Sequence, residues 1–172
     1  MGPKAAETAT LQFNQTPALR LGDADFDYTA FVDLGNLMWC AMAVGTCEAI
    51  KAYCIKYANE RTAFGEPISH RQSVAFMIAD MAMKVETARL MVLKACWMRD
   101  QGLEFSKEAA MAKCYAADVA MQVTTDAVQV MGGYGYSREY PVEKMMRDAK
   151  ITEIYEGTSE VQRMVISGAL LK

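Results

Sequence analysis

The chain has 172 residues, enough for one domain with a substantial core, and its 52% content of hydrophobic residues excludes a disordered protein. Its formal net charge is −3 and its basic residues form no cluster, so we expect no nucleic-acid partner. The longest apolar run, Leu37 to Val44, is too short to cross a bilayer, so we expect no membrane span.

Residues 1–25 differ in character from the rest of the chain. Residues 11–13 form a short alternating stretch, and Pro17, Gly22 and several aspartates follow it. These features are typical of a strand remnant, a loop and the start of a helix.

Three long helical segments follow, separated by breaks that contain glycine or proline. We expect them at about residues 28–61, 69–102 and 106–132, with Ser69 as the N-cap of the second and Gln72 at its capping-box position. Apolar residues repeat at helical spacing along the second and third segments. They are Val74, Met77, Ile78, Met81, Val85, Ala88, Val92 and Ala95, and then Ala112, Ala116, Val119, Val123, Ala127 and Val130.

Two shorter helices complete the pattern. Pro141 suits the first turn of a helix that continues to about Lys150, and a last helix follows Glu156. Antiparallel packing of the long helices through short loops predicts an all-α fold, an up-down four-helix-type bundle. The first helix has a wide apolar arc, which indicates burial on several sides by another subunit or another domain.

The five cysteines are predicted to be buried hydrophobes in a reducing compartment, either a bacterial cytoplasm or a mitochondrial matrix. Cys40, Cys47 and Cys54 stand seven residues apart on one helical stripe, where they cannot reach one another. No Cys-x-x-Cys pair occurs and the chain has one histidine, so we expect no metal site.

Glu156 is the first candidate for chemistry. Gly157 supplies a flexible joint directly after it, and Thr158 or Ser159 can cap a final helix, with Gln162 at the capping-box position of Ser159. A carboxylate at a helix entrance can be held in place and desolvated, which makes it a stronger proton acceptor. The alternative is an ordinary surface glutamate in a helix-entry turn.

Two further segments carry candidate ligand contacts. Glycines in 129–136 (QVMGGYGY) let a ligand touch backbone amides at a helix C-terminus, where a neutral nucleoside suits the dipole better than a phosphate. In 60–68, Arg61 has the planar fork that grips phosphates, and Phe64 can pack on an aromatic ring. The alternatives are a plain helix stop for the first segment, and a solvated arginine with a phenylalanine plug for the second.

From about residue 26 to the end, the chain resembles the C-terminal helical domain of the acyl-CoA dehydrogenase family. The resemblance rests on four ordered segments: 57–68 (YANERTAFGEPI), 129–136 (QVMGGYGY), 147–151 (RDAKI) and 154–163 (IYEGTSEVQR). Each segment alone is weak, but the ordered set is specific. The resemblance implies a helical domain over 26–172 and, in 1–25, a leader and the remnant of a preceding β domain or linker.

The resemblance also implies an FAD flavoprotein that forms a double bond between the α and β carbons of an acyl-CoA thioester. In it, Glu156 takes the α proton. Contacts with acyl-CoA are implied for Asp33, Asn36, Tyr155 and Gly157, although the family often has an arginine where the uncharged Asn36 stands. Contacts with FAD are implied for Arg61, Thr62, Ala63, Phe64, Arg71, Gln72, Gln129, Gly132, Gly133, Thr158, Ser159 and Glu160. Those before Thr158 would touch the FAD of a neighbouring subunit.

The family resemblance further implies a homotetramer, a dimer of dimers, that passes electrons to electron-transfer flavoprotein. Members of the family also have an N-terminal helical domain and a middle β domain, and both contribute to the flavin and substrate sites. We therefore expect this chain alone to bind FAD poorly. The alternative, from another class, is a helical self-association module that keeps the fold and does no chemistry alone.

Overall fold

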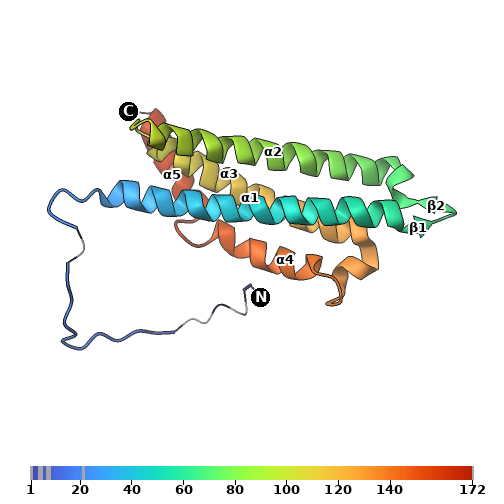
Figure 1. Cartoon of the computed structure of the whole chain (residues 1–172), viewed down its shortest axis with the longest axis horizontal. Coiled ribbons are helices and arrows are strands. Elements are labelled where there is room, and N and C mark those ends of the chain that lie inside the picture. The colour runs from blue at the N-terminus through green and yellow to red at the C-terminus, as the bar shows by residue number, and fades with distance from the viewer. Residues whose placement is uncertain (1, 4–5, 7–8, 21, 172) are drawn as a thin grey trace.

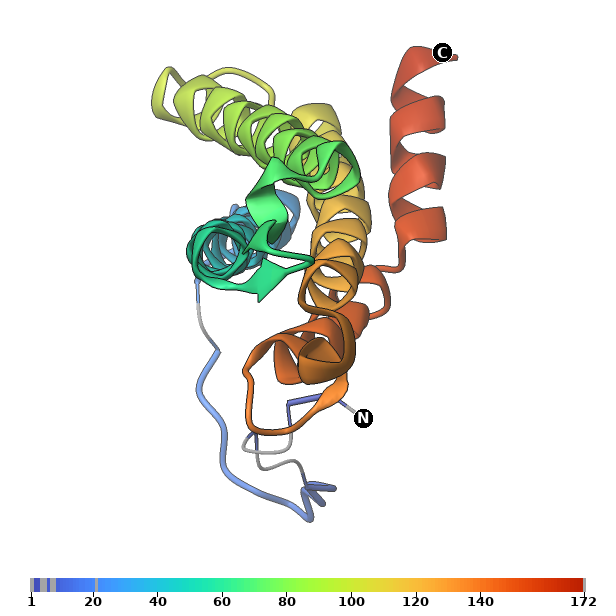
Figure 2. The same cartoon turned by 90° about the vertical axis from the view of Figure 1, so that its right-hand side faces the viewer.

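The computed structural model describes residues 2, 3, 6, 9–20 and 22–171. Three long helices, α1, α2 and α3, lie side by side, α4 lies beside them, and α5 packs against α3 (Figures 1 and 2). The elements are α1 (Tyr28–Glu60), β1 (Thr62–Ala63), β2 (Glu66–Pro67), the 3₁₀ helix η1 (Ile68–His70), α2 (Gln72–Asp100), α3 (Ser106–Met131), η2 (Gly132–Tyr136), α4 (Val142–Ala149), η3 (Lys150–Glu153) and α5 (Ser159–Leu170). The predicted all-α bundle is confirmed.

The central helix of the bundle is α3, which contacts α1, α2, α4 and α5. Its predicted apolar stripe is buried along its whole length, and the alanines in that stripe let neighbouring helices approach closely. The largest fully buried apolar side chains come from four different helices, so one continuous core joins them. They are Ile50, Met81, Val85, Val123 and Val142.

Helix α1 begins and ends within one residue of the prediction. The Asp27 side chain caps it by accepting a hydrogen bond from the backbone N–H of Ala30 at 2.9 Å, as the acidic helix-start signal predicts. By length and composition alone, α1 is the one helix in the described part of the chain that could cross a membrane. It packs against α2 and α3, however, and a core helix passes the same test. The absence of a membrane span stays a prediction.

The five cysteines are free, and four of them are buried, which confirms their predicted packing role for those four. Cys96 on α2 is partly exposed. The three thiols of α1 share one buried stripe with the rest of the core.

The connection between α1 and α2 is a β-hairpin that the sequence patterns did not reveal. β1 and β2 pair antiparallel, and their two-residue turn has positive φ at Phe64 (55°) and Gly65 (88°), the conformation of a type I′ turn. The predicted N-cap was wrong: Ser69 lies inside η1, and α2 begins at Gln72 after Arg71, which makes no side-chain cap. The 3₁₀ turn after the hairpin moves the N-cap position of α2 by two residues, from Ser69 to Arg71.

The segment before α1 is an irregular chain that loops out from the start of α1 and turns back beneath the bundle (Figure 1). Near its beginning, Pro3 lines a cavity with Trp39 of α1 and Tyr155. Residues 11–13 form no strand, and residues 1, 4, 5, 7, 8 and 21 of the predicted leader and linker lie outside the described residues. The division of the chain at residues 25 and 26 stays a prediction, although α1 begins two residues later.

Candidate active site

The loop between η3 and α5 carries Glu156. Glu156 (φ 53°) and Gly157 (φ 84°) both have left-handed backbone conformations, which turn the chain sharply before α5. Glycine adopts this conformation without cost, whereas the Glu156 backbone is strained by about 1–2 kcal/mol. The side chain of Glu156 is exposed, so the described residues do not provide the predicted desolvation.

The cap of α5 differs in detail from the prediction. Thr158 is the N-cap, and its hydroxyl oxygen accepts a hydrogen bond from the Val161 backbone N–H at 3.3 Å. Ser159 is the first residue of the helix instead of its cap. The Gln162 side chain does not close a capping box: its Nε2 donates to the carbonyls of Glu156 (3.2 Å) and Gly157 (3.3 Å), because the turn directs both oxygens toward α5.

Lys113 of α3 lies beneath the same loop. Its side chain is 2% exposed, and its Nζ donates to the Gly157 carbonyl oxygen at 2.6 Å. Desolvation lowers the pKa of Lys113 below its usual 10.5, while nearby acidic groups, Glu156 among them, act in the opposite direction. The sequence reasoning missed this residue. The available signal was its place on the apolar face of α3, in helical register with Ala109, Ala116 and Ala120.

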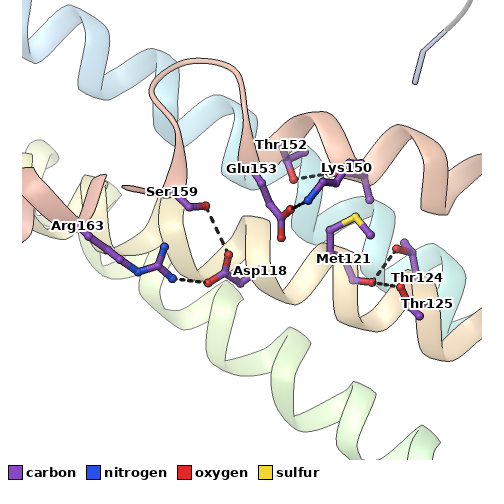
Figure 3. Close-up of polar contacts among 10 residues, drawn as sticks. Asp118, Met121, Thr124, Thr125, Lys150, Thr152, Glu153, Ser159 and Arg163 are labelled. Atoms are coloured by element: carbon purple, nitrogen blue, oxygen red, sulfur yellow. Dashed lines mark hydrogen bonds and ion pairs between the residues drawn. The ribbon is translucent and has the colours of Figure 1, made fainter. Parts of the chain in front are cut away.

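Asp118 of α3 fixes the start of α5, as Figure 3 shows. Its carboxylate accepts a hydrogen bond from the Ser159 hydroxyl at 3.4 Å and pairs with Arg163 Nη2 at 2.9 Å. Of the predicted FAD contacts in this loop, Ser159 is buried and its hydroxyl already donates to Asp118. Thr158 is partly exposed and Glu160 is exposed. The backbone N–H of Glu160 and the Thr158 hydroxyl lower the pKa of the Glu160 carboxyl.

The predicted substrate contacts fall into two places. Tyr155 stands directly before Glu156 and packs against Trp39 of α1 with ring centroids 4.6 Å apart, and burial raises the pKa of Tyr155 to about 12. Asp33 and Asn36 lie on α1. Asp33 accepts a 2.5 Å hydrogen bond from Ser106, and burial raises its pKa.

Asn36 is 4% exposed, and its Oδ1 has no hydrogen-bond partner among the described residues. A buried amide oxygen without a donor costs about 1–3 kcal/mol. The contact of Asn36 and Asp33 with acyl-CoA stays a prediction.

A second group of candidates lines a cavity of about 640 Å³ at the hairpin end of the bundle. The predicted residues that line it are Arg61, Ala63, Phe64, Arg71, Gln129, Gly132 and Gly133. Thr62 and Gln72 are their neighbours in the chain but do not line it. Tyr57 and Tyr134 also line it. Both lie in segments that carry the family resemblance, 57–68 and 129–136, although neither was named as a site residue.

Two guanidinium groups lie at this cavity, each near an aromatic ring. The guanidinium carbon of Arg61 is 5.3 Å from the Tyr134 ring centroid, and that of Arg71 is 5.8 Å from the Phe64 ring centroid. Arg71 also pairs with Glu66 at 3.1 Å. Arg61 is exposed, so its fork remains accessible to an anionic ligand.

The glycine pair after α3 supplies open backbone to the cavity. Gly132 (φ 59°, ψ −137°) ends the helix as predicted, and its positive φ favours glycine at this position. A Cβ built on Gly132 or Gly133 would meet nothing within 4 Å, so a ligand can approach the backbone there. Positive charge, aromatic rings and open backbone in one cavity suit the phosphate and adenosine parts of a dinucleotide such as FAD.

The Glu156 loop and the hairpin cavity are far apart along α3. Lys113 contacts the loop and Gly132 follows the last residue of the same helix, which is 19 residues or about 28 Å of helical rise. The two groups of predicted FAD contacts therefore do not form one pocket within this chain. Among the residues that the structure describes, no three His, Cys, Asp or Glu side chains come close enough together to hold a metal ion.

Known proteins resemble this chain in sequence and in fold. A family model described as acyl-CoA dehydrogenase, C-terminal domain, matches residues 28–171. The short-chain specific acyl-CoA dehydrogenase of Megasphaera elsdenii is 52% identical over 141 residues, which cover 82% of this chain and 37% of that protein. The structure of butyryl-CoA dehydrogenase from Megasphaera elsdenii matches with a TM-score of 0.82 and 51% identity, covering 84% of this chain and 38% of that one. Subunit CarC of the caffeyl-CoA reductase-Etf complex of Acetobacterium woodii is 46% identical over 156 residues, which cover 89% of this chain and 41% of that protein.

The chain spans less than half the length of these relatives. The family model covers the helical bundle from the first residue of α1 to the residue after α5, and with it every predicted site residue. The chain therefore belongs to the acyl-CoA dehydrogenase family, whose C-terminal domain it matches.

Proposed function

We propose that this chain is the base-bearing C-terminal domain of an FAD-dependent enzyme that oxidises an acyl-CoA thioester to its α,β-unsaturated form. The observation that carries the proposal is the Glu156 loop, which presents an exposed carboxylate. The backbone carbonyls of this loop accept hydrogen bonds from Lys113 and Gln162. Membership of the acyl-CoA dehydrogenase family supports the reaction class.

The reaction needs a base because an α C–H beside a thioester carbonyl is only weakly acidic. The Glu156 carboxylate accepts that proton, and the fixed backbone of the loop sets the direction from which it approaches. FAD, when bound, accepts the hydride from the β carbon. Glu156 is exposed in this chain, so the substrate and further protein surface must cover it to exclude water.

We also propose two kinds of FAD contact. Thr158 and Glu160 lie beside the base and face the FAD that reacts there. Arg61 and Arg71 at the hairpin cavity bind the phosphate and adenosine parts of the FAD of a neighbouring subunit. The distance of about 28 Å along α3 supports this division, because one site in one chain would need the two groups to be adjacent.

Self-association into a homotetramer follows from the same proposal. Four apolar side chains on α2 are each more than half exposed and stand seven residues apart, a spacing typical of a helix–helix seam. They are Phe76, Met83, Leu90 and Trp97. This stripe also supports the alternative function, a helical self-association module without chemistry of its own.

Electron-transfer flavoprotein is the proposed electron acceptor, because the Acetobacterium woodii relative is a subunit of an Etf complex. We place the enzyme in a reducing compartment, a bacterial cytoplasm or a mitochondrial matrix. The free, mostly buried cysteines support that placement.

The test is anaerobic mixing of the purified protein, expressed from its complete reading frame, with acyl-CoA thioesters of several chain lengths. We expect a yellow protein whose flavin absorbance bleaches. Glu156→Gln should keep the flavin spectrum and slow bleaching by about 100- to 10,000-fold, the usual contribution of a general base. Glu153→Gln, three residues earlier and paired with Lys150, should bleach at the wild-type rate.

Two results would contradict the proposal. Bleaching of Glu156→Gln at the wild-type rate would place the base elsewhere. A colourless protein that takes up no FAD and still self-associates would favour the alternative module.

A further inference from the structure

Two buried donors support the Glu156 loop from different helices. Lys113 of α3 donates to the Gly157 carbonyl at 2.6 Å, and Gln162 of α5 donates to the carbonyls of Glu156 and Gly157 at 3.2 and 3.3 Å. Lys113 is 2% exposed and Gln162 is 4% exposed. Neither side chain takes part in the proton or hydride transfer described above.

Lys113 is an unusual residue for the interior of a bundle. Burial of an ammonium group is costly, and buried lysines are normally paired with a carboxylate. Lys113 forms no ion pair within the described part of the chain, and its hydrogen-bond partner there is a neutral carbonyl. An apolar side chain of similar length would serve stability at least as well, so stability alone does not account for the ammonium.

The loop that these donors hold is strained. Glu156 has a left-handed φ of 53°, which a residue with a side chain avoids when nothing holds it. Relaxation of this one residue would redirect its side chain, because φ and ψ set the direction of the Cα–Cβ bond. The Gln162 contacts on the carbonyls of both loop residues and the Lys113 contact on the second oppose that relaxation.

We propose that Lys113 and Gln162 are positioning residues for the Glu156 base. They keep the loop carbonyls inside the domain, between α3 and α5, and thereby keep the Glu156 carboxylate on the exposed side where substrate binds. This inference rests on the proposed function for its kinetic consequence. The holding of the loop itself does not depend on that function.

The first experiment measures the loop directly. A glutamate-specific protease cleaves after Glu156 when the loop opens, and mass spectrometry identifies the released fragment, residues 157–172. We expect Lys113→Met to accelerate this cleavage by about 10-fold or more, the equilibrium factor for one charge-assisted hydrogen bond. Lys107→Met is the matched control, because Lys107 lies on the same helix, is more exposed, and pairs with Glu108 at 3.3 Å. It should leave the cleavage rate unchanged.

The second experiment measures the reaction of the flavoprotein. Lys113→Met should lower the rate of flavin bleaching by about 100-fold, the effect of misplacing a reacting group by about 1 Å, with the KM for acyl-CoA and the flavin spectrum unchanged. Gln162→Leu should act in the same direction. The double variant should lose less than the product of the two single losses, because both donors act on the Gly157 carbonyl. The melting temperature of Lys113→Met should not fall.

The outcomes distinguish the positioning role of Lys113 from the proposed oxidation of acyl-CoA. Unchanged cleavage of Lys113→Met would overturn the inference, and so would faster cleavage with wild-type bleaching. A joint loss of melting temperature, flavin and bleaching would show a merely structural role and would also overturn it. Failure of the wild-type protein to bleach with any acyl-CoA would remove the proposed function, whereas the cleavage rates would still decide whether Lys113 holds the loop.

Discussion

Replacement of Gly157 by alanine tests how tightly the Glu156 loop is constrained. Gly157 has φ 84°, a conformation that costs an L-residue about 1–2 kcal/mol. A Cβ there would lie 2.7 Å from Gln162 Nε2, so the amide of Gln162 must move away from the two carbonyls that it contacts. The loss of two such hydrogen bonds costs about 1 kcal/mol each.

These contributions sum to a loss of about 3–4 kcal/mol, of which the lower entropy of the unfolded alanine chain recovers less than about 1 kcal/mol. For a chain of this size, the remaining loss lowers the melting temperature by about 4–16 °C. Urea unfolding followed by far-UV circular dichroism measures the change in the free energy of unfolding.

Gly45→Ala is the matched control for this substitution. Gly45 lies in the middle of α1 with an ordinary helical φ, and a Cβ there would meet nothing within 4 Å. The same chemical change should therefore stabilise the protein by about 0.5–1 kcal/mol. Equal unfolding midpoints for Gly157→Ala and the wild type would contradict this prediction, because neither strain nor the displacement of Gln162 would then have a cost.

Two further predictions concern buried titratable groups. A thiol reagent should modify partly exposed Cys96 in the native protein and leave the three thiols of α1 unmodified until denaturant is added. The reason is that burial raises the pKa values of those three thiols to about 12. Rapid modification of all five cysteines in the native protein would contradict this. Lys113→Met should be more stable than the wild type at pH 7, and its advantage should shrink as the pH rises toward 10.5. The reason is that the buried Lys113 has a lowered pKa, so the unfolded wild-type chain binds more protons than the folded one in the window below 10.5. Denaturant titrations of both proteins across that range measure the difference in unfolding free energy, and an advantage that grows with pH would be the contrary result.

The sequence predicted the long helices well because their signals extend over many residues. The bounds of α3 follow from an apolar stripe that ends at a glycine pair, and both signals lie within the helix segment itself, so no distant contact is needed to recognise them. The hairpin between α1 and α2 was missed because two-residue strands are too short for any periodicity to register. Ser69 has the right residue type for an N-cap, but the 3₁₀ turn that follows the hairpin places it before the helix starts.

The candidate site was predictable where its residues belong to one motif and was missed where they come from distant segments. Glu156 and Gly157 are neighbours in sequence, so their strained turn could be anticipated from the glycine. Lys113 meets Gly157 only through the packing of α3 beneath the loop, a contact across 44 positions that sequence spacing cannot reveal.

In the proposed enzyme, the Glu156 carboxylate lies against the α carbon of an acyl-CoA thioester, with FAD on the opposite side of the substrate. The most direct measurement is a crystal structure of the complete protein with FAD and a thioester analogue that cannot be oxidised. We expect a carboxylate oxygen of Glu156 about 3–3.5 Å from the α carbon, the separation of a near-attack geometry. A Glu156 side chain that points into bulk solvent, away from the bound thioester, would contradict it.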